Sequence, residues 1–193
     1  MGNVTGLTVL GLQLNAKRIQ LLCESFGQLK RIGVLTNPGA PYTVEFRGQQ
    51  SRIAGALGVE LAQIEVREIG QLTTASAGLA KAKVQGILIL ADIMFLAHRE
   101  RVVEWVAATG LPATYPDRGF IDVGGLMFYG AALPDMYRHA ASLVDRILRG
   151  AKPADLPVQQ PTRFRLVLNA RSAQSQNLVI PMHLRALADE IIE

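Results

Sequence analysis

Short apolar runs alternate along this chain with longer stretches in which apolar residues recur every three or four positions. The first pattern is typical of buried strands and the second of amphipathic helices. The runs predict strands at residues 30–36, 59–66, 85–91, 112–115 and 126–129. The periodic stretches predict helices at residues 14–26, 42–57, 71–83 and 93–109. Because strands and helices alternate through short connections, we expect an α/β fold with a doubly wound, mainly parallel five-stranded sheet flanked by helices.

The pattern changes after Gly130. An amphipathic helix is expected at 134–149, followed by an irregular proline-rich segment, a strand at 164–169, a short helix from about Arg171 and a final helix from Pro181. We therefore expect three parts, with the last completing the lobe and ending in a helical appendage. They are an α/β lobe at 1–130, a helix with a proline-rich segment at 131–161, and a return strand with helices at 162–193.

Composition excludes several classes of protein. Hydrophobic residues make up 49% of the chain and charged residues 19%, which is enough apolar material for a core. The longest apolar run, at 86–91, is far shorter than the ~20 residues of a membrane helix. The formal charge of +4 is scattered over pairs such as Lys17-Arg18 and Lys30-Arg31, so no nucleic-acid partner is predicted.

Signatures of catalysis and metal binding are also missing from the sequence. The single cysteine, Cys23, lies among apolar residues of a predicted helix, where we expect an inert packed thiol. The three histidines fall on separate predicted helices without metal-ligand spacing, and the chain has neither a phosphate-binding glycine motif nor a GxSxG nucleophile elbow. We therefore predict no metal and no cofactor. An enzyme using Asp92 or Asp117 as acid or base, and a cytoplasmic ligand-sensing domain, stay open as alternatives.

Ligands of open parallel sheets lie beyond the carboxyl ends of the strands. The residues there that could contact a ligand combine an amide, a carboxylate, a guanidinium and aromatic rings, which suits a small polar or amphipathic organic molecule. They are Asn37, Pro38, Ala40, Asp92, Phe95, Tyr115, Arg118 and Tyr129. Each group has a structural alternative. Asn37 and Asp92 are natural helix caps, Asp117 and Arg118 could pair at the surface, and the tyrosines could pack at the rim.

Several segments resemble the second half of bacterial ABC-transporter substrate-binding proteins with type I periplasmic-binding architecture, a family related to aromatic amino acid binders. The segments are GNVTG at 2–6, AKR at 16–18, IGVLTNP at 32–38, GGLMFYG at 124–130, YR at 137–138 and ILRGAKPADLPVQQPT at 147–162. The last of these is the most specific. The similarity extends over essentially the whole chain.

The resemblance implies two α/β lobes around a cleft, a small solute trapped when the lobes close, and delivery to ABC permease subunits. It implies no catalysis. The loops at Asn37, Asp92 and Tyr115 would then face the cleft, with Gly130 near a hinge. By this resemblance the chain lacks the first lobe and its signal peptide, so the expected location is periplasmic for the family and cytoplasmic for the sequence as given.

In such proteins the helix at 134–149 packs on the first lobe. Without that partner, Tyr137, Val144, Ile147 and Leu148 would expose an apolar stripe. Burying one large apolar side chain is worth ~1.5–3 kcal/mol. We therefore predict that the stripe is covered, either by the chain's own domain or by a second copy in a homodimer.

Overall fold

In the computed structural model, which describes residues 3–27 and 29–193, seven strands form one sheet in the order β2-β1-β3-β4-β5-β6-β7. Gly2, which begins the first family-like segment, lies outside the described residues. The strands are β1 (Arg31–Thr36), β2 (Glu60–Glu65), β3 (Gly86–Ile89), β4 (Ala113–Tyr115), β5 (Met127–Ala131), β6 (Phe164–Asn169) and β7 (Glu190–Ile192). The helices are α1 (Gly11–Ser25), α2 (Pro41–Leu57), α3 (Leu72–Lys81), α4 (Ile93–Ala97), α5 (Arg99–Thr109), α6 (Arg118–Ile121), α7 (Leu133–Leu148), α8 (Ala170–Ser175) and α9 (Met182–Leu187), with 3-10 turns at Ile69–Gln71 and Pro153–Asp155.

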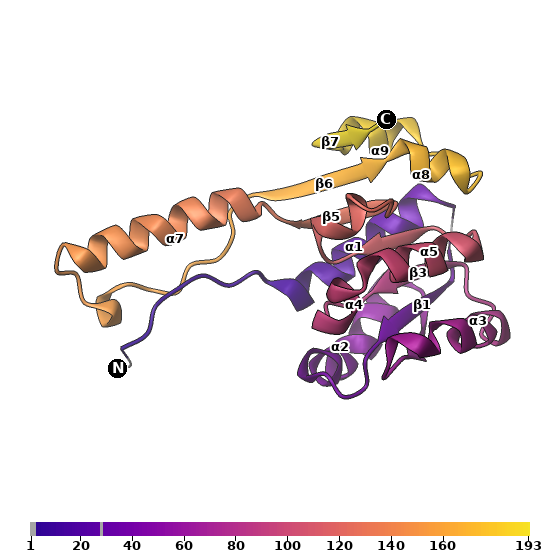
Figure 1. The fold of residues 1–193 in the computed structure, drawn as a ribbon, viewed down its shortest axis with the longest axis horizontal. Coiled ribbons are helices and arrows are strands. Elements are labelled where there is room, and N and C mark those ends of the chain that lie inside the picture. The colour runs from indigo at the N-terminus through magenta and orange to yellow at the C-terminus, as the bar shows by residue number, and fades with distance from the viewer. Residues whose placement is uncertain (1–2, 28) are drawn as a thin grey trace.

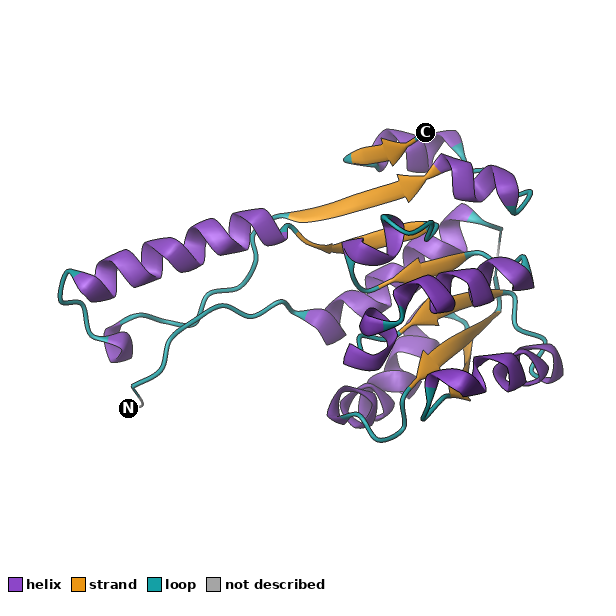
Figure 2. Ribbon diagram, in the orientation of Figure 1, coloured by secondary structure: helices purple, strands orange, loops and turns teal. Residues whose placement is uncertain are grey.

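Helices cover both faces of the sheet (Figure 2). Alternate strand residues point to opposite faces, so Leu35 and Ile89 join one apolar core with α3, α5 and α6, whereas Val34 and Leu88 join the other with α1, α2 and α9. The central strands β1 and β3 are buried on both faces, which explains why they appear in the sequence as continuous apolar runs. The predicted doubly wound, mainly parallel α/β fold is confirmed.

The sheet has seven strands rather than the predicted five. Strands β1 to β5 are parallel, β6 runs antiparallel to β5, and β7 runs parallel to β6. The final helix expected from Pro181 is also wrong in part, because α9 ends at Leu187 and β7 follows. β7 pairs with β6, and Asp189, just before β7, holds the chain against β6 through two hydrogen bonds. Its backbone N–H donates to the Leu166 carbonyl at 2.9 Å, and its carboxylate accepts the Leu166 N–H at 2.8 Å.

A helical arm projects from this α/β body (Figure 1). The chain leaves the body after β5, forms α7 and returns through residues 149–163 to β6, while residues 3–10 run beside the returning segment. Backbone hydrogen bonds join the two segments, with the Thr8 N–H donating to the Gln159 carbonyl at 3.0 Å and the Gln159 N–H donating to the Gly6 carbonyl at 2.9 Å. Three segments therefore cross between body and arm. The division at 130/131 and 161/162 remains a prediction.

The apolar stripe of α7 is only partly covered. Met136 and Leu143 are buried, but Tyr137, Val144 and Leu148 are 74%, 55% and 81% exposed. The expectation that the stripe folds back on its own domain is therefore wrong for these three residues, because α7 leads away from the body (Figure 1). Among the described residues, no helix is long and apolar enough to cross a membrane.

Candidate functional site

A pocket of about 340 Å³ lies beyond the carboxyl ends of the central strands. These ends point to the side of the body from which α7 projects (Figure 2). The pocket is bordered by α1, the loops after β3 and β4, the end of β5 and the root of α7. Its lining is mainly apolar and includes Val9, Gly11, Leu14, Arg18, Tyr42, Ala91, Asp92, Ile93, Leu96, Pro116, Asp117, Phe120, Phe128, Ala131 and Leu133.

The structure brings together two of the predicted site residues, Asn37 and Asp92. The Asn37 side-chain amide donates to Asp92 Oδ2 at 3.1 Å. Asp92 Oδ1 also caps α4, accepting the backbone N–H groups of Met94 at 2.8 Å and Phe95 at 3.4 Å. Asn37 Oδ1 accepts the Gly39 N–H at 3.2 Å. Asp92 is therefore a helix cap, as the structural alternative predicted, whereas Asn37 stabilises the turn between β1 and α2. Contact with a ligand stays a prediction for both.

A second hollow adjoins the pocket and shares Tyr42, Asp92 and two further residues with it. Asn37 and Ala40 line this hollow, whereas Pro38 is half-buried in the turn between them and lines neither. The turn after β1 and the first turn of α2 thus form one continuous border with the start of α4. This border is the part of the predicted site that the fold assembles at the expected edge of the sheet.

The side chains of Phe95 and Tyr115 do not reach the pocket. Both are buried in the core, at 0% and 1% exposure, and Tyr115 stacks on Phe120 with ring centroids 5.2 Å apart. Burial raises the pKa of the Tyr115 hydroxyl, so it stays protonated. The next residue, Pro116, does line the pocket. The side chain of Tyr129 is half-buried and stacks on Phe164 at 6.0 Å.

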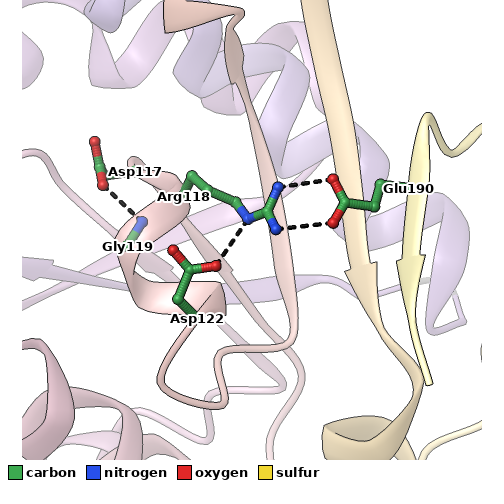
Figure 3. Close-up of polar contacts among 5 residues, drawn as sticks. All are labelled: Asp117, Arg118, Gly119, Asp122 and Glu190. Carbon is green, nitrogen blue, oxygen red and sulfur yellow. Dashed lines mark hydrogen bonds and ion pairs between the residues drawn. The ribbon is translucent and has the colours of Figure 1, made fainter. Parts of the chain in front are cut away.

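Arg118 is held by the carboxylates of Asp122, which follows α6, and of Glu190 in β7 (Figure 3). Its guanidinium donates to both oxygens of Glu190, at 2.7 and 2.8 Å, and to Asp122 at 3.0 Å. These hydrogen bonds raise the pKa of Arg118. Asp117 does not pair with Arg118. It caps α6 instead, accepting the Gly119 N–H at 2.7 Å. Arg118 therefore ties β7 to α6, and it does not line the pocket.

Sequence patterns missed Arg18 and Tyr42. Arg18 is 2% exposed and lies on the buried face of α1, although it was counted among scattered basic residues. A signal was present, since Leu14, Arg18 and Leu22 follow one another at spacings of four on one helix face. An arginine on an apolar face is rarely buried without a partner. Tyr42, at the start of α2, lines both hollows and accepts the Asn15 amide N–H at 3.4 Å.

Burial is the largest cause of the pKa shifts of Arg18 and Tyr42. It lowers the pKa of Arg18, and the nearby Tyr42, Tyr129 and Asp117 act in the opposite direction. Burial likewise raises the pKa of Tyr42, although the positive charge of Arg18 opposes that shift. Within residues 3–27 and 29–193, no group of three His, Cys, Asp or Glu side chains could hold a metal ion.

Several solved structures have a similar fold. A conserved domain protein from Vibrio cholerae is 24% identical with a TM-score of 0.81, and the match covers 98% of this chain and 63% of that one. An ABC domain from Streptococcus pneumoniae, solved with L-Trp, is 23% identical with a TM-score of 0.78, covering 99% and 65%. A ligand-free, open substrate-binding protein from Clostridium difficile gives 15% and 0.73, covering 91% and 59%. At these identities the matches show the fold.

The family follows from the sequence. The family model for ABC transporter substrate-binding proteins matches residues 1–192, so this chain belongs to that family. Members bind small-molecule solutes, work with ABC transporter components and are normally periplasmic, and the family is not one of enzymes. The chain spans just under two thirds of the first two structures that it matches. No curated protein matches it.

Proposed function

We propose that this chain forms one solute-binding lobe of an ABC-type importer and holds a small organic molecule in the pocket at the carboxyl ends of β1, β3 and β4. The observation that carries the proposal is the position of that pocket. It lies between the α/β body and the root of α7, where three segments cross between body and arm. A ligand bound there contacts both parts and stabilises one orientation of the arm relative to the body.

The rim of the pocket supports closure by a second lobe. Ile93 is 87% exposed, and Leu96 and Leu133 are each 38% exposed, so apolar side chains surround an opening to water. Covering them gains roughly 25 cal/mol for each Å² of apolar surface removed from water. In this proposal the opposing lobe is not part of this chain, and Asn37 and Asp92 form the polar border that it meets.

The exposed face of α7 is the second contact with that lobe. Tyr137, Val144 and Leu148 pack there in the closed protein, which accounts for a helix of sixteen residues that is solvated on its apolar side. A homodimer through residues 134–149 is the alternative occupant. Light scattering on this chain separates the two, because the dimer predicts twice the monomer mass and the lobe proposal predicts a monomer.

Solute binding is tested by thermal shift and calorimetry with a panel of small organic solutes. Binding to this chain is expected to be weaker than micromolar, because half of the contacts come from the opposing lobe. Ile93→Ser should weaken binding, and the matched control Val179→Ser should leave it unchanged, since Val179 is 81% exposed and lies outside the pocket. Equal effects of the two changes would contradict the proposed site.

A further inference from the structure

Arg18 joins three segments of the chain at the base of the arm. Its side chain comes from α1 and is 2% exposed. Nε donates to the Tyr129 carbonyl in β5 at 2.8 Å, and Nη2 donates to the Pro116 carbonyl after β4 at 3.4 Å. Nη1 donates to Asn15 Oδ1 at 2.8 Å and to the Gly11 carbonyl at 3.4 Å. One guanidinium therefore contacts the start of α1, the β4–α6 loop and β5.

Two of these three segments lead directly into the arm. Residues 3–10 run from the arm into Gly11, the first residue of α1, and Tyr129 lies four residues before the start of α7. The third crossing segment ends at Arg163, whose carbonyl accepts the Ala132 N–H at 3.1 Å at the root of α7. The contacts made by the Arg18 side chain therefore act on two crossing segments directly and on the third through this backbone hydrogen bond.

Both direct connections to the arm pass Arg18 at a constrained backbone position. Leu10, immediately before Gly11, has a φ of 50°, in the left-handed region that L side chains rarely adopt. Gly130 immediately follows Tyr129, and a Cβ there would lie 2.6 Å from an aromatic ring of β5 and 3.7 Å from Nη2 of Arg18. The direction of each connection is therefore fixed next to an acceptor of the guanidinium.

The hydrogen-bond geometry of Arg18, more than its charge, matches this position. Burial lowers the pKa of the guanidinium, and nearby Tyr42, Tyr129 and Asp117 offset part of that effect. The hydrogen-bonded acceptors are three backbone carbonyls and one side-chain amide on separate segments. A guanidinium presents five N–H groups in a rigid planar fork, whereas a lysine ammonium is a point charge on a flexible stem. Arginine can therefore hold these segments at fixed angles to one another.

We propose that Arg18 is the positioning residue of the arm. Its guanidinium holds the start of α1, the loop after β4 and the end of β5 in one arrangement, and this arrangement sets the direction in which α7 leaves the body. Because Pro116 also lines the pocket, one side chain holds both the pocket wall and the root of the arm. This role does not depend on the proposed function, since it concerns the arm of the chain without a solute.

The test measures the distance between body and arm by double electron–electron resonance. Spin labels are attached at Ser51→Cys in α2 and Arg146→Cys in α7, two exposed positions. Cys23→Ser removes the native thiol, and excess unlabelled chain suppresses signals between copies. Because Arg146 lies near the far end of α7, its label moves by several ångström when the helix changes direction at its root. We expect one narrow distance distribution in this background, and Arg18→Gln should widen or displace it by several ångström.

Two controls separate positioning from stability and from charge. Leu79→Ala truncates a buried side chain of α3, on the side of the body away from the arm (Figure 1), and should lower the melting temperature without changing the distance distribution. Arg18→Lys keeps the charge without the fork and should widen the distribution as Arg18→Gln does. A distribution that stays narrow in either Arg18 variant, or widens equally in Leu79→Ala, would overturn the inference and leave the proposed function standing.

A second position keeps the test valid if the Arg18 variants do not fold, which circular dichroism reports. Asn15→Ala removes one acceptor of Nη1 and leaves Arg18 in place. The distance distribution should then be wider than that of Leu79→Ala, because the guanidinium is held by fewer partners. A distribution as narrow as that of the Leu79→Ala chain would overturn the inference.

Discussion

Replacing Asp92 separates two roles that its position allows. Asp92→Ala removes the cap of α4 and the acceptor for the Asn37 amide. Loss of an N-cap costs about 1 kcal/mol and loss of a hydrogen bond about 1 kcal/mol, giving about 2 kcal/mol in total. In a domain of this size each kcal/mol shifts the melting temperature by about 2–4 °C. We therefore expect the melting temperature to fall by about 4–8 °C.

The matched variant is Asp92→Asn, because asparagine caps helices as well as aspartate does. Its amide oxygen can accept the Met94 N–H, whereas its NH2 group takes the place of Oδ2 and cannot accept from the Asn37 amide. We therefore expect the cap to be kept and about 1 kcal/mol of stability to be lost with the Asn37 hydrogen bond. Thermal and urea unfolding, followed by circular dichroism, measure both variants. If Asp92→Asn lost as much stability as Asp92→Ala, the carboxylate charge rather than the cap would hold α4, and the reasoning would be wrong. Preserved stability with altered ligand binding would assign Asp92 to the ligand.

Three further predictions concern packing, a surface ion pair and a thiol. Gly125→Ala should destabilise the protein by about 1–3 kcal/mol, because a Cβ there would lie 2.7 Å from a backbone oxygen of α6. The control Gly48→Ala in α2 meets nothing within 4 Å and should stabilise the protein by about 0.5–1 kcal/mol. Urea unfolding measures the free energy of unfolding of both variants. Glu190→Gln should cost under about 1 kcal/mol, because its pair with Arg118 is about one-third exposed on each side, and the loss should shrink in 1 M salt; a larger, salt-independent loss would contradict this. Burial raises the pKa of the Cys23 thiol, so the thiolate forms at a higher pH than in a free cysteine. Alkylation of Cys23 at neutral pH, followed by mass spectrometry, should therefore be slower in the folded chain than in the unfolded chain. Equal rates would refute this prediction.

The parallel sheet could be predicted because its cause is local to each strand. Strands β1 and β3 are covered on both faces, and this double burial requires the uninterrupted apolar runs that the sequence contains. β7 lacked such a signal. It is three residues long, follows a helix directly, and owes its conformation to pairing with β6, more than twenty residues earlier in the chain.

The candidate site stays a prediction, but the structure shows which of its side chains lie at the expected edge of the sheet and which do not. Position after a strand correctly placed Asn37 and Asp92 side by side. It did not determine which way a side chain points at the strand end, so Tyr115 turned out to face the core. Arg18 could not be placed from loop positions, because it reaches the pocket from a helix that packs across the sheet.

In the proposed function, the arm built on α7 would act as a lever. Its sixteen residues give a rod about 24 Å long, since each helical residue adds about 1.5 Å. Its root is pinned where the Ala132 N–H donates to the Arg163 carbonyl at 3.1 Å, a few residues from the pocket lining. A rotation of about 10° at that root would carry the tip by roughly 4 Å. If the proposed function holds, small adjustments around a bound molecule would thereby become displacements large enough for another protein to detect.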